Sequence, residues 1–232
     1  IFTASFSNFD GRYANNGWMQ ELPDPVTKVT WDNVALLSAN TAKQLGVKNE
    51  DRLKVSTSGV DVVLPVWIQP GMADNTLALE LGYGREIGRV STGVGANVGV
   101  LRYASGMNIA SGFTAEKALG THTLACVQDH HGFDEEKLAA DAIQERLPAI
   151  VRESTLSDYQ KDPEFAMAFA EKNELKGMWK EHDYGEGNQW GMSIDLTSCT
   201  GCSACTIACQ SENNIPIIGK DEVSNGRDMS WI

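Results

Sequence analysis

The sequence has little positive charge and no long apolar run. Its 232 residues include 19 Lys and Arg against 31 Asp and Glu, which gives a formal net charge of -12. Binding to a nucleic-acid backbone needs a basic surface, so we expect no nucleic-acid partner. No apolar stretch approaches the ~20 residues that a membrane-spanning helix requires, and the sequence predicts no such helix.

Several recognisable signatures are also missing. Residues 1–5 contain neither an initiator Met nor the start of a signal peptide, so we expect the chain to begin inside a longer domain. Nothing matches the GxSxG elbow, a phosphate-binding P-loop or a pair of catalytic carboxylates. The sequence therefore assigns no catalytic residue, and it leaves any residues that contact an organic cofactor unknown.

Residues 26–112 have the pattern of a β-rich unit. Asp51–Thr57 alternates with a period of two, Ser58-Gly59 is a turn signal, and Val60–Ile68 is a run of β-branched residues. Together these segments predict a hairpin. Residues 76–81 are a further strand candidate.

A short helix fits before this hairpin. Ser38 is suited to cap its N-terminus, Ala42 and Leu45 to face inward, and Gly46 to end it. Strands separated by Gly-rich turns, with one short helix inserted, predict a small barrel rather than a parallel sheet.

Glycine is dense between residues 82 and 99. Its spacing misses the GxGxxG fingerprint, and no amphipathic helix follows. Two interpretations stay open: tight turns of a barrel, which the pattern favours, and a ligand groove lined by backbone.

From residue 113 to residue 187 the pattern becomes helical and polar. We expect Thr114 to cap a short helix, and a second helix to run from Asp134 to Leu147 until Pro148 stops or kinks it. A polar, Gly-containing stretch follows and predicts a domain boundary. The expected domains are a β-barrel over residues 1–112, a helical connector over 113–187 and a third domain over 188–232.

Four of the five cysteines fall within eleven residues, after a strand candidate over residues 190–196. Their spacing is C-x2-C-x2-C-x3-C, and Gly201 supplies backbone freedom between the first two. Three thiolates at this spacing wrap one 4Fe-4S cluster, while the fourth begins a helix and ligates the second cluster of a two-cluster module. The predicted metal ligands are Cys199, Cys202, Cys205 and Cys209.

Zinc is the competing metal for these thiolates. Zinc ribbons and fingers place a spacer of ~12 or more residues between two ligand pairs, and this segment has none, which favours iron–sulfur over zinc. Three cysteines leave one cluster corner without a ligand, so a second Cys motif is required. We therefore expect the sequence to stop inside a longer iron–sulfur domain.

Four other residues carry open interpretations. Cys126, between apolar neighbours, is typical of a buried small hydrophobic residue, and completing a cluster is the alternative. His122, His130 and His131 are either metal ligands and proton carriers or hydrogen-bonding histidines. No HExxH-like element accompanies them, which favours the hydrogen-bonding role.

The motif also resembles a known family. Residues 199–209, followed by Gln210 rather than Pro, resemble the four-cluster electron-transfer subunits of dimethyl-sulfoxide-reductase-type molybdopterin oxidoreductases. Residues 15–33 and the strands that follow resemble the C-terminal cofactor-binding barrel of molybdopterin enzymes. A barrel joined to such an iron–sulfur domain, with residues 128–131 and 151–156 between them, resembles the large iron–sulfur subunit of bacterial alternative complex III.

This resemblance implies a double-psi-type β-barrel, a helical connector and the start of a ferredoxin-like 4Fe-4S domain. It also implies that the molybdopterin cofactor and its catalysis are absent. The full subunit would carry three 4Fe-4S clusters and one 3Fe-4S cluster. Electrons would pass from a quinol site in an NrfD-like membrane subunit to multihaem and monohaem cytochrome c subunits.

A Tat-like signal in family members implies a peripheral location on the periplasmic face of the bacterial cytoplasmic membrane, with membrane contact through partners. Two other functions remain as alternatives. One is an active molybdopterin oxidoreductase of the polysulfide or thiosulfate reductase type, suggested by the Gly-rich residues 82–99. The other is an interaction module stabilised by zinc.

Overall fold

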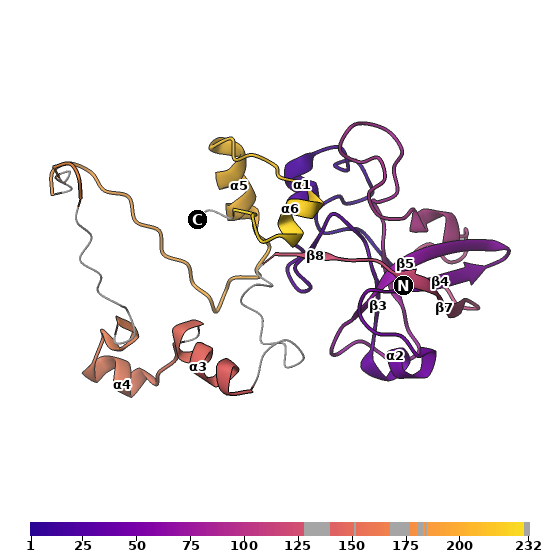
Figure 1. Cartoon of the computed structure of the whole chain (residues 1–232), viewed down its shortest axis with the longest axis horizontal. Helices are drawn as coiled ribbons and strands as arrows, with labels where there is room; N and C mark the ends of the chain where they lie inside the picture. Colours follow the sequence, from indigo (N-terminus) through magenta and orange to yellow (C-terminus); the bar gives the residue numbers. More distant parts are fainter. Residues whose placement is uncertain (128–139, 151, 168–176, 181–182, 184, 230–232) are drawn as a thin grey trace. The chain divides into compact units, whose positions relative to one another are not determined.

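Residues 1–127, 140–150, 152–167, 177–180, 183 and 185–229 are described by the computed structural model of the chain (Figure 1). They fall into two units. One joins the described residues up to 127 to those from 200 onward, and the other holds the described residues between them. The structure is mixed α/β and rich in sheet, and none of its described helices is long and apolar enough to cross a membrane.

The main sheet has six strands in the order β1-β6-β3-β5-β4-β7. β4 pairs antiparallel with both β5 and β7, whereas β3 runs parallel to β5 and antiparallel to β6, and β1 runs parallel to β6. β2 and β8 form a separate antiparallel pair. The strands are β1 (Phe2–Thr3), β2 (Val29–Thr30), β3 (Ala35–Leu37), β4 (Asp51–Thr57), β5 (Val60–Ile68), β6 (Ala78–Glu80), β7 (Thr114–Thr121) and β8 (Ala125–Cys126).

The predicted hairpin of β4 and β5 is confirmed. Ser58 and Gly59 form its two-residue turn, with φ angles of 49° and 81°. Positive φ at both positions matches the twist of the flanking strands, which is why Gly is favoured there. The alternating residues Leu53, Val55 and Leu64 are fully buried and form part of the core.

The predicted short helix is α2 (Ala39–Leu45). The Ser38 hydroxyl accepts a hydrogen bond from the Thr41 backbone N–H at 3.1 Å, as an N-cap should. Gly46 ends the helix in the left-handed conformation with a φ of 64°, and Ala42 is buried.

The helix predicted at Thr114 is wrong, because residues 114–121 form strand β7 along β4. This conformation depends on pairing with β4, which is distant in the sequence. Local propensity cannot predict such pairing. Helices α3 (Ala140–Ile150) and α4 (Leu156–Lys161) and the 3₁₀ turn η3 (Phe165–Met167) lie in the predicted connector. α3 continues two residues beyond Pro148, because a proline in the last turn of a helix costs one backbone hydrogen bond. The predicted helix start at Asp134 lies outside the described residues.

The remaining helices are α1 (Gly17–Glu21), α5 (Ala204–Glu212), α6 (Lys220–Ser224) and the 3₁₀ turn η1 (Val98–Leu101). The strand predicted over residues 190–196 is not formed: this segment has no regular structure, and Trp190 is fully exposed. A strand needs a ladder partner, and the described residues provide none here. The double-psi topology and the ferredoxin-like start stay predictions.

The largest apolar core contains residues from the main sheet, α2 and η1. A second buried cluster consists of Trp31, Ala125, Val127 and Val223. It brings α6, after the cysteine motif, against the residues around β2 and β8. Burial of these side chains therefore ties the C-terminal segment to the N-terminal part of the first unit.

Candidate metal centre: the cysteine motif

The cysteine motif follows a hydrogen-bonded turn centred on Asp195. Its carboxylate accepts hydrogen bonds from the Thr197 backbone N–H at 2.9 Å and from the Ser198 hydroxyl at 2.9 Å. The Thr197 and Ser198 side-chain hydroxyls hold the pKa of Asp195 below its usual value. The backbone N–H of Cys199 donates to the Asp195 carbonyl oxygen at 2.9 Å, so this turn fixes where the first cysteine begins.

Two left-handed residues bend the chain between the cysteines. Gly201 has a φ of 68°, which confirms the unusual backbone conformation expected there, and Ser203 has a φ of 55°. Ser203 is the residue before α5. The prediction that Cys209 begins a helix is wrong, because α5 begins at Ala204 and already contains Cys205. Cys205 and Cys209 lie four residues apart on α5, and this spacing places them on one face of the helix.

The sulfur atoms are accessible and receive N–H groups. Cys199, Cys202 and Cys205 are exposed, and Cys209 is half-buried. A hydrogen bond from the Ala204 backbone N–H, and then one from the Thr200 side chain, lowers the pKa of the Cys202 thiol. The Asn213 amide Nδ2 lies 3.5 Å from Cys209 Sγ. N–H groups directed at sulfur favour the thiolate form that metals bind.

The described residues do not bring these sulfurs into one cluster: no three Cys, His, Asp or Glu side chains among them are close enough to share a metal ion. The fit to iron–sulfur clusters rests instead on the donor set and the backbone. Four thiols stand within eleven residues, with left-handed turns between them and N–H donors at Cys202 and Cys209. These are the donors that iron–sulfur clusters use.

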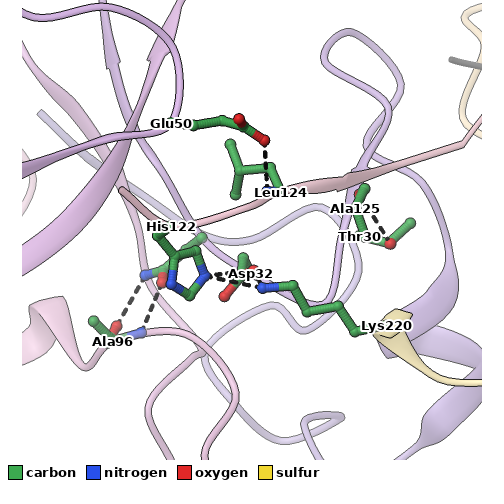
Figure 2. Close-up of polar contacts among 9 residues, drawn as sticks. Thr30, Asp32, Glu50, Ala96, His122, Leu124, Ala125 and Lys220 are labelled. Atoms are coloured by element: carbon green, nitrogen blue, oxygen red, sulfur yellow. Dashed lines mark hydrogen bonds and ion pairs between the residues drawn. The ribbon is translucent and has the colours of Figure 1, made fainter. Parts of the chain in front are cut away.

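His122 has a hydrogen-bonding role, as the sequence favoured. Its Nε2 lies 3.0 Å from Asp32 Oδ2 and 2.9 Å from Lys220 Nζ (Figure 2). Lys220 Nζ can only donate and Asp32 Oδ2 only accept, so the imidazole tautomer decides which of the two His122 pairs with. His130 and His131 lie outside the described residues.

Cys126 lies on β8 opposite Val29 and packs against the small cluster of Val29, Val34 and Leu124. This placement fits the prediction of a small hydrophobic residue.

The Gly-rich segment forms tight turns beside a cavity. A Cβ on Gly84 would lie 2.1 Å from the Asn97 backbone nitrogen, and one on Gly95 would lie 2.7 Å from Asn33 Oδ1. Buried Asn33 fixes this loop by donating to the Ala96 carbonyl at 2.9 Å and accepting from the Ala96 N–H at 2.8 Å. These contacts support the tight-turn interpretation.

A cavity of about 160 Å³ lies beside the same loop and keeps the ligand-groove interpretation open. Polar side chains on its wall belong to Asp32, Arg52 and His122. Sequence reasoning missed Asp32 and Asn33 as site residues, because each acts on segments far away in the sequence. The neighbouring residues in the sequence have no pattern that predicts a contact with a distant segment.

Comparison with known proteins finds a family match within the N-terminal part of the chain. Residues 6–115 match the family described as the molydopterin dinucleotide binding domain. The chain therefore contains a domain of this family, and the match covers β3 to β6, the hairpin and the Gly-rich loop.

Short segments of the chain are similar to reductase subunits. One relative is the iron–sulfur cluster-binding subunit of menaquinone reductase from Nitratidesulfovibrio vulgaris, 70% identical over 45 residues, which are 19% of this chain and 17% of that protein. A selenate reductase subunit from Mesobacillus selenatarsenatis is 64% identical over 28 residues, 12% of this chain and 10% of that protein. The arsenate respiratory reductase iron–sulfur subunit from Chrysiogenes arsenatis is 54% identical over 26 residues, 11% of this chain and 87% of that sequence.

The chain thus spans less than a fifth of the first two of these relatives. All three are subunits of reductases, and two are named as iron–sulfur subunits. The chain combines a molybdopterin dinucleotide-binding domain with partial similarity to such subunits.

Proposed function

We propose that the chain is an electron-transferring iron–sulfur component of a respiratory oxidoreductase complex. The observation that carries this proposal is the C-x2-C-x2-C-x3-C motif in the same chain as a molybdopterin dinucleotide-binding domain. Its similarity to iron–sulfur subunits of menaquinone and arsenate reductases supports the proposal.

In this proposal Cys199, Cys202 and Cys205 hold one 4Fe-4S cluster, and Cys209 holds its neighbour. A bound cluster supplies one-electron transfer. The chain's own residues place the thiolates: the Asp195 turn sets the backbone of Cys199, and the Ala204 N–H donates to the Cys202 sulfur. Hydrogen bonds to ligating sulfur are also a means of tuning the reduction potential.

Within this class, we infer the large iron–sulfur subunit of alternative complex III. Residues 128–131 and 151–156, between the two parts, resemble that subunit. The subunit would be peripheral on the periplasmic face of the membrane and conduct electrons from a quinol site in an NrfD-like subunit to multihaem and monohaem cytochrome c. The 4Fe-4S and 3Fe-4S clusters would be its only cofactors, without molybdopterin.

One observation favours a second candidate, an active molybdopterin oxidoreductase of the polysulfide or thiosulfate reductase type. The cavity beside Gly93 and Gly95 has Arg52 and His122 on its wall. In the described part of the chain no hydrogen bond or ion pair engages the exposed Arg52 guanidinium. A cationic side chain beside a glycine loop suits an anionic cofactor.

Metal and sulfide analysis of the intact complex, prepared without oxygen, tests these functions against each other. We expect acid-labile sulfide together with iron in excess of it, because the haem c subunits add iron without sulfide, and we expect molybdenum, tungsten and zinc below stoichiometric levels. Stoichiometric molybdenum or tungsten would establish the enzyme instead, and zinc without sulfide would establish the zinc-stabilised interaction module.

A further inference from the structure

The segment that follows the cysteine motif contacts the molybdopterin-type domain through backbone and side-chain hydrogen bonds. Trp18 Nε1 donates to the Ile215 carbonyl oxygen at 2.8 Å. The Glu21 carboxylate accepts from the backbone N–H groups of Ile218 at 3.2 Å and Gly219 at 2.9 Å. Both acceptor and donor groups on α1 are therefore used to hold residues 215–219.

A charged group lies at the centre of this contact. Lys220 Nζ donates to Asp32 Oδ2 at 2.5 Å, and both atoms lie beside His122 Nε2 (Figure 2). The Asp32 side chain is only 4% exposed, whereas that of Lys220 is 29% exposed. A buried carboxylate is costly without a counter-charge, so Asp32 selects a cation from the C-terminal segment.

Apolar packing surrounds the charged group. Val223 of α6 is 1% exposed and packs with Trp31, Ala125 and Val127. At Gly17 a Cβ would lie 2.5 Å from Ile217 Cδ1, so a larger residue there would push the end of the Ile217 side chain aside. The side-chain fit at Gly17, the charge of Asp32 and the apolar packing of Val223 thus all favour contact with the C-terminal segment.

We propose that residues 17–21, 31–32 and 122–127 form a docking face whose occupant is the chain's own segment 215–224. Docking at this face, rather than the connector, fixes α5 and its cysteines on the molybdopterin-type domain. α5 ends at Glu212, three residues before the first docked residue, and α5 also contacts α1. Lys220 is a positioning residue in this arrangement. The docking does not depend on the proposed electron-transfer function.

Cleavage of the connector tests the docking directly. A site for a sequence-specific protease replaces exposed residues near Glu153 in the full 232-residue chain, and the cut protein is passed over a gel-filtration column in native buffer. All four motif cysteines stay on the C-terminal piece, so no cluster bound by them alone joins the two pieces. We expect the two pieces to elute together in native buffer and to separate in denaturant.

Three lysine variants identify the basis of the association. Lys220→Met should weaken it at least tenfold, because Asp32 loses its cation, and Lys220→Arg should preserve it. Lys161→Met is the matched control, since Lys161 is 77% exposed on α4 and pairs with Asp158 three residues away. Separation of the native cut pieces, or equal association in the Lys220→Met and Lys161→Met variants, would overturn the docking proposal.

Acid-labile sulfide is measured separately on the intact complex, because the 232-residue chain lacks the second Cys motif that the clusters require. Cut pieces that stay together, with no sulfide in the intact complex, would support the docking face and count against the iron–sulfur function. Pieces that separate, with sulfide present in the intact complex, would do the reverse.

Discussion

Glu80 is the residue whose burial has the clearest consequence for stability. It ends β6 and lines a cavity of about 20 Å³ together with Asp24 and Tyr83. Burial, and then repulsion from Asp24, raises the pKa of Glu80 from 4.5 to about 7. Burial and the nearby Glu80 likewise raise the pKa of Tyr83 to about 12.

Stability should therefore depend on pH through Glu80. In the unfolded chain Glu80 ionises near pH 4.5, whereas in the folded chain it keeps its proton until about pH 7. The stabilising contribution of this proton is complete below pH 4.5 and is lost as the pH rises through 7. Glu80→Gln should thus stabilise the fold by about 1–3 kcal/mol at high pH and by close to zero at low pH.

Urea unfolding at pH 8 and at pH 4 measures this difference. Glu86→Gln, at an exposed loop position, is the matched control and should change stability little at either pH. A Glu80→Gln effect of the same size at both pH values would contradict the assignment.

At the scale of elements, sequence predicted what local interactions determine. The hairpin of β4 and β5 and the helix α2 were predictable because alternation, the Ser38 cap and the left-handed Gly46 all act within a few residues. β7 was predicted as a helix because its conformation depends on pairing with β4, a non-local contact. The strand predicted over residues 190–196 failed for the converse reason, since its pattern has no partner strand among the described residues.

The loop before α5 is the element on which metal binding depends most. Gly201 has a φ of 68° with no atom near the position of a Cβ, so a side chain there would strain the backbone without a clash. Gly201→Ala should lower the iron bound per chain several-fold, because the thiolates on either side would be displaced.

Gly187→Ala controls for a general effect on the backbone. Gly187 has a φ of 86°, also with open space around it, but lies outside the cysteine motif. Its iron content should match that of the unsubstituted protein. Equal iron in both variants would show that the left-handed residue is not needed for the metal.

For the whole molecule, the candidate site divides into a part that sequence predicts and a part that it does not. Ligand spacing is local, so the cysteine motif was predictable from residues 199–209 alone. Lys220 and Asp32 are 188 positions apart in the sequence, and no pattern in the residues around either one predicts their contact. The position of the cysteine motif on the molybdopterin-type domain therefore depends on tertiary contacts that its own residues do not predict.

The central claim is that residues 199–209 hold iron–sulfur clusters that transfer electrons. Electron paramagnetic resonance of the chemically reduced intact complex tests it most directly, with Cys205→Ser and Cys126→Ser compared with the unsubstituted protein. We predict interacting iron–sulfur signals that persist in Cys126→Ser and lose one component in Cys205→Ser. A complex without iron–sulfur signals, or a spectrum that Cys205→Ser leaves unchanged, would contradict the claim.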